Sequence, residues 1–174
     1  MSAAPVPPVD PTIAAYVRRL RAASEAMVAL QDGIQAGEPW PLAEAFGAEP
    51  EAQWGPREVL AHCAEMLPYW SGELERILAG REPARYGRTQ EDAIRTATIE
   101  RDRTLPIREL MDRIATSTGR HLRRLPDFTA ADVARRGLHP TLGEQTVDQV
   151  LERVLVGHLE GHVEQLREAL AARS

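Results

Sequence analysis

The chain has 174 residues, of which 43% are hydrophobic and only 5% aromatic, and 26 acidic against 21 basic residues give a formal net charge of −5. A chain of this length can form one domain with a sizeable core, and its acidic balance argues against a general nucleic-acid-binding protein. Every basic residue is Arg and none is Lys, which excludes a Schiff-base enzyme, a P-loop and the usual kinase site.

Cysteine usage and hydropathy indicate the compartment. The single cysteine, Cys63, cannot form an internal disulfide, so a reducing compartment is expected. No run of about 18 apolar residues suggests a transmembrane helix. The Pro-rich residues 1–9 lack the basic region and apolar core of a signal peptide, and they are predicted to form a flexible arm before a single helical domain over residues 10–174. We therefore expect a cytoplasmic protein without nucleic-acid or membrane partners.

Apolar residues of helical period predict the first two long helices. Asp10 and Pro11 are typical of a cap followed by a first-turn proline, and the pattern after them predicts one helix of about 24 residues. Residues 43–54 are predicted to be a loop with one short turn. Gly55-Pro56 then opens a second helix that ends near Gly80, and Pro68 inside it is expected to kink it.

The second half of the chain predicts two more long helices and short connections. Thr89 with Asp92 can cap a segment that reaches about Arg103, and a third core helix follows between Pro106 and Pro126. A short capped turn at Thr129, a turn-rich loop over 137–143 and a capping box of Thr146 with Gln149 lead into the final helix. No useful length alternates with period two, so no sheet is predicted. Four amphipathic helices with one long crossover connection predict an all-α four-helix bundle.

The final helix carries two histidines on its apolar face. Val147, Val150, Leu151 and Val154 lead along this face to His158 and His162, which take the next core-facing positions. Residues four apart on a helix project from one face, a spacing that suits two ligands of one metal ion. The pair alone is a weak signal. Leu159 and Gly161 stand where the two zincin signatures need Glu, and the Glu-x-x-His pairs of a di-iron bundle are missing.

A third histidine, His62, lies on the buried face of the second helix. The second and fourth helices of a bundle can face one another, so three histidines could converge at one end. Three protein ligands with an open position are typical of a catalytic metal site. The alternative is three separate core histidines, each hydrogen-bonded to its own neighbour.

Two stretches of the chain resemble a known family. The first has the pattern Trp-x-Pro-x-x-x-x-x-His and runs from Trp54 to His62. The second begins at His139 with the loop His-Pro-x-x-Gly-x-x-Thr and continues into the helix with His-x-x-x-His followed by Gln165. Together they resemble the DinB/YfiT-like superfamily of four-helix-bundle proteins. That superfamily is related to thiol-dependent S-transferases and to the N-terminal domain of the mycothiol-dependent maleylpyruvate isomerase.

The resemblance implies a metal site and a reaction. A divalent ion, Zn or Ni, would be held by His62, His158 and His162. A low-molecular-weight thiol such as mycothiol or bacillithiol would be the cofactor, and a small electrophile would be the other substrate of a transferase. Two alternatives stay open: a metal-dependent hydrolase that uses activated water, and a non-catalytic, stress-related binding module. A homodimer formed through the Ala-rich first helix is also expected.

Two neighbours of the histidines are candidates for supporting roles. Glu65 lies one turn beyond His62 and could orient an imidazole or act as the catalytic proton carrier, with a solvated surface residue as the alternative. Gln165 lies one turn beyond His162 and could support that ligand, with a capping or core role as the alternative.

Three further residues are expected to be structural rather than metal ligands. Cys63 follows His62 directly, and neighbours on a helix point about 100° apart, so Cys63 is expected to fill the core. His121 is expected to be a core residue or to interact with a helix C-terminus. His139 is expected to anchor its loop through hydrogen bonds.

Overall fold

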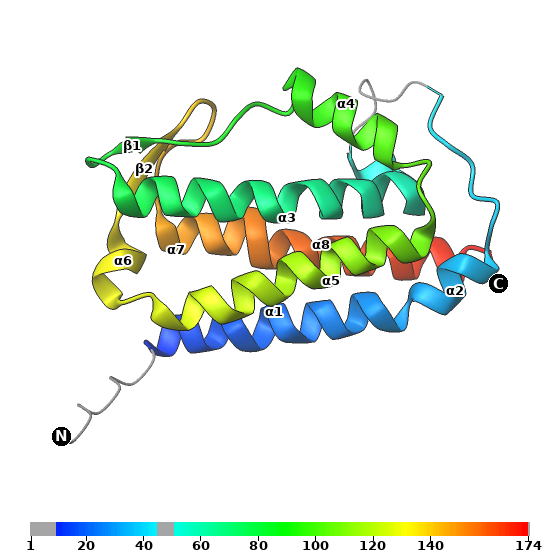
Figure 1. The fold of residues 1–174 in the computed structure, drawn as a ribbon, viewed down its shortest axis with the longest axis horizontal. Coiled ribbons are helices and arrows are strands. Elements are labelled where there is room, and N and C mark those ends of the chain that lie inside the picture. The colour runs from blue at the N-terminus through cyan, green and yellow to red at the C-terminus, as the bar shows by residue number, and fades with distance from the viewer. Residues whose placement is uncertain (1–9, 45–50, 174) are drawn as a thin grey trace.

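The computed structural model describes residues 10–44 and 51–173, and its long helices lie side by side as a four-helix bundle (Figure 1). This confirms the predicted fold class. The bundle consists of α1 (Pro11–Ala29) continued by α2 (Gln31–Ala36), α3 (Pro56–Ala79), α5 (Ile107–Arg124), and a last helical run made of α7 (Val147–Val150), the π-helix η3 (Leu151–Val156) and α8 (Gly157–Ala171).

The helices pack in a ring in which α1 and α3 are diagonal partners. Helix α3 contacts α5 and α8, and α1 contacts the same two helices from the other side. Buried aliphatic side chains of every long helix fill the space between them, with Leu20, Leu60, Leu110 and Leu159 among the fully buried ones. Helix α3 packs against α8, as predicted for the second and fourth long helices of the bundle. This packing brings His62 toward the histidines of α8.

Side-chain caps define where the helices begin. Asp10 Oδ1 accepts the backbone N–H of Thr12 at 2.8 Å, and Pro11 occupies the first turn. The predicted capping box of Thr146 with Gln149 is present and opens the last helical run. The first helix is shorter than predicted, because α1 ends at Ala29 and a separate short helix, α2, continues the apolar stripe.

Short helices connect the long ones. Asp92 caps α4 (Ala93–Asp102), and a complete capping box at Thr129 opens α6 (Ala130–Ala134). Single turns of 3₁₀-helix lie at η1 (Glu51–Gln53) and η2 (Leu125–Asp127). In Figure 1, α4 lies outside the bundle, along α3, with which it is in contact. The turn η1 is the short turn predicted within 43–54, and its first residue is Glu51.

A small sheet at one end of the bundle contradicts the prediction of no sheet. Strand β1 (Ala84–Arg85) pairs in parallel with β2 (Arg136–His139), which pairs antiparallel with β3 (Gly143–Thr146). The hairpin between β2 and β3 replaces the predicted loop over 137–143, and Gly143 has a φ of +72° there. Strands of two to four residues are too short to show an alternating pattern, which is why the sequence did not reveal them.

Other expectations concern the surface and the ends of the chain. The predicted arm over residues 1–9 lies outside the described residues. Among the described helices, none combines the length and apolarity needed to cross a bilayer.

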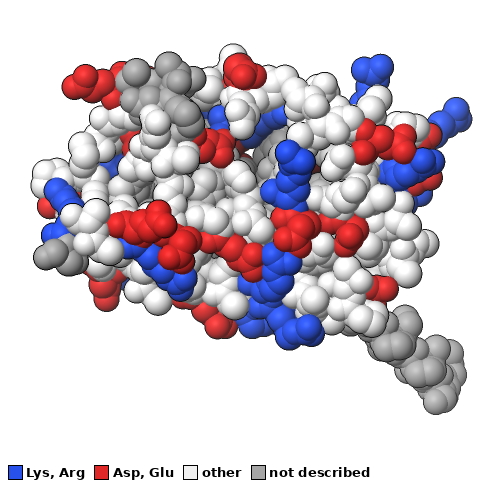
Figure 2. All heavy atoms as spheres, turned by 180° about the vertical axis from the view of Figure 1, so that it is seen from behind, with Lys and Arg blue, Asp and Glu red and all other residues white. Residues whose placement is uncertain are grey.

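Acidic side chains form a band beside arginines on the face drawn in Figure 2, so this face shows charges of both signs and no broad basic surface.

Candidate metal centre

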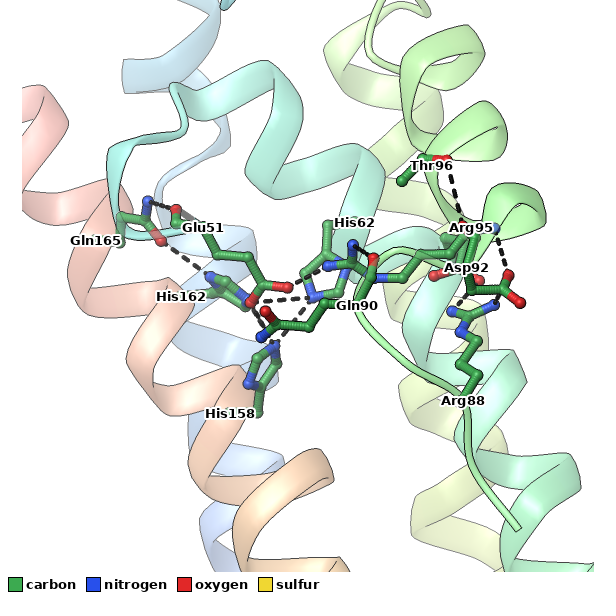
Figure 3. A network of polar contacts seen from close by, with 11 residues as sticks. Glu51, His62, Arg88, Gln90, Asp92, Arg95, Thr96, His158, His162 and Gln165 are labelled. Carbon is green, nitrogen blue, oxygen red and sulfur yellow. Dashed lines mark hydrogen bonds and ion pairs between the residues drawn. The ribbon is translucent and has the colours of Figure 1, made fainter. Parts of the chain in front are cut away.

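Three histidine side chains converge between α3 and α8 (Figure 3). The Nε2 atom of His158 lies 2.9 Å from Nε2 of His62 and 2.9 Å from Nε2 of His162. His62 comes from the buried face of α3, while His158 and His162 come from successive turns of α8. The structure thus brings together all three residues that the sequence predicted as metal ligands, with the same ring nitrogen of each pointing at a common centre.

Gln165 determines which nitrogen of His162 carries the proton. Its Nε2 donates to the carbonyl oxygens of Glu51 at 2.8 Å and Trp54 at 3.1 Å, so its Oε1 must be the atom that faces Nδ1 of His162 at 3.0 Å. Because an amide oxygen only accepts, Nδ1 of His162 is the protonated nitrogen and Nε2 keeps its lone pair. The structure places Gln165 in contact with His162, and a partner of this kind would orient the imidazole of a metal-binding histidine.

Burial keeps the three imidazoles neutral. The pKa of His62 lies well below its usual 6.5, because burial disfavours the charged form and the neighbouring histidines add to this effect. Burial, followed by the charges of His162 and Arg95, lowers the pKa of His158 to about 3. Burial also lowers the pKa of His162, although its hydrogen bond with Gln165 opposes the shift. At neutral pH, therefore, none of the three histidines carries a positive charge that could attract the other two rings.

The donor set fits a divalent transition metal. A single Nε2–H among these neutral imidazoles can donate to only one neighbouring nitrogen, whereas a cation at their centre would accept the lone pairs of all three Nε2 atoms. Tetrahedral Zn ligands at about 2.0 Å from the ion lie about 3.3 Å apart, close to the 2.9 Å between these nitrogen atoms. Imidazole suits Zn, Cu, Fe and Ni rather than Mg or Ca. The residues present therefore match the ion that the family resemblance implies.

Glu51 is a fourth group at the same centre, and it was not predicted. Its Oε2 lies 3.6 Å from Nε2 of His158 and 4.0 Å from Nε2 of His62. Its other carboxylate oxygen is bound by the buried guanidinium of Arg95, which also donates to the carbonyl of Gln90 at 3.0 Å. The four ligand atoms of Glu51 and the histidines all lie within 4.8 Å of one another. Figure 3 shows Glu51 reaching toward the histidines from η1.

A cavity of about 220 Å³ adjoins this centre. His62, His158 and Glu51 form part of its wall, and Met66 and Trp70 contribute apolar surface. The side chain of His158 keeps 30% of its surface exposed, whereas that of His62 keeps only 5%. His158 is therefore the histidine most open to the cavity, and a ligand in the cavity can approach the centre from that side.

Glu65 lies away from the cluster. Its carboxylate pairs with Nη2 of Arg88 at 2.5 Å, its side chain is only 9% exposed, and it belongs neither to the four grouped ligands nor to the cavity wall. The proton-carrier role of Glu65 stays a prediction, but the structure brings a different carboxylate, that of Glu51, next to the histidines.

The other two histidines and the cysteine have structural contacts. Nε2 of His121 lies 2.8 Å from the carbonyl of Leu67, so His121 is a buried core residue. Nδ1 of His139 accepts the backbone N–H of Thr141 at 3.2 Å, which agrees with a loop anchor. Cys63 is fully buried, and burial raises the pKa of its thiol, so it is poorly suited to act as a nucleophile.

Sequence reasoning missed Glu51 and Arg95 because neither belongs to a periodic pattern. Glu51 lies in a loop three positions before Trp54, and Arg95 is one of several arginines in a polar stretch. The sequence feature closest to Glu51 is the motif from Trp54 to His62. Because His62 belongs to the site, the residues just before Trp54 can be expected to lie near the site as well. Only the fold places η1 and α4 over the histidines.

Comparison with known proteins agrees with this architecture. YfiT from Bacillus subtilis, described as a probable metal-dependent hydrolase with an unusual four-helix bundle topology, is 18% identical, with a TM-score of 0.69 over 99% of this chain and 93% of that one. At this identity the likeness concerns the fold. No curated protein matches the sequence. The family model of the DinB superfamily matches residues 19–166, and the chain belongs to that superfamily.

Proposed function

We propose that the protein is a metal-dependent transferase that activates a low-molecular-weight thiol, such as mycothiol or bacillithiol, for attack on a small electrophile. His62, His158 and His162 would hold one divalent ion, Zn or Ni. The observation that carries this proposal is the convergence of three Nε2 atoms beside a cavity, with the tautomer of His162 set by Gln165.

The surroundings of the histidines suit activation of a thiol. A divalent cation held here supplies a positive charge that lowers the pKa of a neighbouring thiol or water. Oε2 of Glu51 faces the same centre and can take up the S–H proton, while Arg95 holds the other carboxylate oxygen in place. The sulfur then forms a bond to the electrophilic carbon, and the leaving group departs with the electron pair of the broken bond. Met66 and Trp70 provide apolar surface for the substrate.

Metal analysis tests the proposed ligands. Protein purified without a nickel column should contain about one divalent ion per chain, as a three-histidine site predicts. His62→Ala should lose most of this metal. His121→Gln is the matched control, because it replaces a core histidine outside the cluster and retains a hydrogen-bond donor. Equal and low metal contents in the wild type and in His62→Ala would contradict the metal site.

Thiol consumption tests the reaction. The metal-loaded wild type should accelerate the loss of a thiol in the presence of 1-chloro-2,4-dinitrobenzene, assayed with mycothiol, bacillithiol and glutathione in parallel. The protein's own Cys63 is fully buried and will not contribute to the signal. A metal-loaded protein that consumes none of these thiols would contradict the transferase.

A hydrolase is the second candidate, and the position of Glu51 favours it. A carboxylate beside three histidines can take a proton from water as well as from a thiol. YfiT, which shares the fold, is described as a hydrolase. Turnover of chromogenic esters and amides without added thiol would support this function. If metal and both activities are missing, the third interpretation, a non-catalytic binding module, becomes the better one.

A further inference from the structure

Three arginines line the cavity beside the histidines, and two of them are already neutralised. Arg95 binds Glu51 and the carbonyl of Gln90. Arg88 binds Glu65 at 2.5 Å, and its guanidinium lies 3.7 Å from the centre of the Tyr69 ring. Figure 3 shows Arg95 reaching toward Glu51, and Arg88 close to Asp92, with which it forms a further ion pair of 3.8 Å. Both therefore hold the wall of the cavity together and leave little charge for a ligand.

The third arginine, Arg153, has no such partner. Among residues 10–44 and 51–173, no carboxylate forms an ion pair with it, and its side chain is exposed at the cavity wall. Its charge still reaches into the site: burial first, and then Arg153, lower the pKa of His139. A guanidinium that lines a cavity without a carboxylate partner is suited to bind the carboxylate of a ligand in bidentate fashion.

The π-helix explains why Arg153 lines the same cavity as His158. In a regular α-helix, residues five apart point about 140° away from each other. Here η3 widens the helix by i→i+5 hydrogen bonds, such as that from Gly157 N–H to the carbonyl of Glu152. Arg153, Val154 and His158 all contribute to one wall as a result. Single π-turns inside α-helices occur frequently at functional sites.

We propose that Arg153 determines substrate specificity by binding a carboxylate at one end of a small molecule whose other end reaches the histidines. This inference rests on the proposed function, because the group at the other end of the small molecule is the one that would react at the metal centre. The cavity of about 220 Å³ sits below the usual range for drug-sized ligands, about 300–1,000 Å³, so it would hold a small organic acid, or the acidic end of a longer thiol that extends out of the cavity.

Paired probes test the carboxylate site. Binding of malonate, succinate, glutarate and adipate to the metal-loaded protein is compared with binding of the monoamide of each, which lacks the second charge. A second pair, 3-mercaptopropionate and 3-mercaptopropionamide, is followed by thiolate-to-cobalt absorption in the cobalt-loaded protein. A preference in the diacid series assigns the carboxylate to the electrophilic substrate, whereas a preference in the mercapto pair alone assigns it to the thiol.

The wild type should bind the charged member of at least one pair about tenfold more tightly, as expected for hydrogen bonds to a charged group. Arg153→Gln should abolish this preference, and Arg153→Lys should retain part of it. Arg108→Gln is the matched control, since Arg108 is an exposed arginine of α5 outside the cavity and should leave the preference unchanged. Circular dichroism should show the same fold for all variants.

Two results would overturn the assignment: no preference for charge in the wild type, or a preference that survives in Arg153→Gln. The proposed function fails by a different readout. If uncharged 3-mercaptopropionamide gives no thiolate absorption with any cobalt-loaded variant, the thiol chemistry is wrong, while the diacid series still decides the role of Arg153.

Discussion

Gln165 uses both ends of its amide, and each end has a different task. The NH₂ group ties the backbone of η1 to α8 through the carbonyls of Glu51 and Trp54. The oxygen faces Nδ1 of His162 and directs the lone pair of Nε2 to the centre. One side chain thus couples the loop that carries Glu51 to the orientation of a histidine.

This coupling predicts the effect of Gln165→Leu. The substitution removes the hydrogen bond that fixes the tautomer of His162, and partners of this kind typically contribute 10–100-fold to metal affinity, so we expect about that loss. A competition titration against a chromophoric chelator measures it. Gln35→Leu, at an exposed position of α2, is the control and should bind metal like the wild type. Unchanged affinity in Gln165→Leu would show that the hydrogen bond does not support the ligand.

The variant Glu51→Gln distinguishes two roles of Glu51, as a proton acceptor and as a metal ligand. If Oε2 of Glu51 receives the proton, the amide should retain the metal and reduce kcat by about 10²–10⁴-fold, the usual contribution of a general base. Metal content and steady-state kinetics of the same preparation give both quantities. Loss of the metal in Glu51→Gln would instead identify Glu51 as a ligand. Glu65→Gln serves as the comparison for a carboxylate bound by an arginine away from the centre.

At the scale of the helix, Gly157 is what allows η3 to form. A Cβ atom at this position would lie 2.6 Å from the carbonyl oxygen of Glu152, which is the acceptor of the Gly157 N–H itself. A side chain therefore cannot enter without moving the backbone one residue before His158. Gly161, one turn later, has nothing within 4 Å of the same added atom.

The two glycines form a matched pair for mutation. Gly157→Ala should destabilise the protein by about 1–3 kcal/mol, as overpacking does, and should weaken metal binding because His158 follows directly. Gly161→Ala should be neutral or should stabilise by up to about 1 kcal/mol, since Ala replaces Gly in an exposed helix. Urea unfolding and the chelator competition measure both variants. Equal behaviour of the pair would mean that the π-turn tolerates a side chain.

The long helices could be predicted because the sequence patterns that define them, apolar periodicity and capping residues, lie within each helix or at its ends. The apolar period of 59–77 marks α3, and the capping box at Thr146 marks the start of the last helical run. The three histidines followed from the same period. The π-turn, the short strands and the approach of Glu51 depend on contacts between distant segments, and no local pattern records them. The spacing from His62 predicts a role for Glu65, but Glu51 is the carboxylate that lies next to the histidines in the folded chain.

For the whole molecule, the buried neutral histidines imply a stability that depends on pH. The pKa of His158 is lowered to about 3, and those of His62, His162 and His121 are lowered as well, mainly by burial. In the unfolded chain each ring binds a proton near pH 6.5. Protons therefore favour the unfolded state as pH falls below about 6.5, and the loss of stability continues toward the folded pKa of each group.

We expect the free energy of unfolding of the metal-free protein to fall between about pH 7 and about pH 5, by up to about 1.4 kcal/mol per pH unit for each histidine kept neutral. Urea titrations in the presence of a chelator measure this change. His158→Asn should show a shallower dependence, because one of the groups is gone. A stability that stays constant over this range would contradict the neutral, buried state of the cluster.

The homodimer through the Ala-rich first helix stays a prediction. Val28, an exposed apolar residue of α1 with 50% of its surface accessible, lies on the helix in question. Light scattering on the 19.3 kDa chain distinguishes a monomer from a dimer, and Val28→Glu should dissociate a dimer formed there.

The converging imidazoles come from segments 96 positions apart, and this has a consequence for the timing of assembly. A ribosome makes His62 long before His158, so a growing chain holds only one of the three nitrogen donors until its final helix emerges and docks on α3. A metal ion bound by all three histidines would then link α3 to α8 only after α8 has been synthesised and has packed against α3. Metal uptake during synthesis would thus report completed folding.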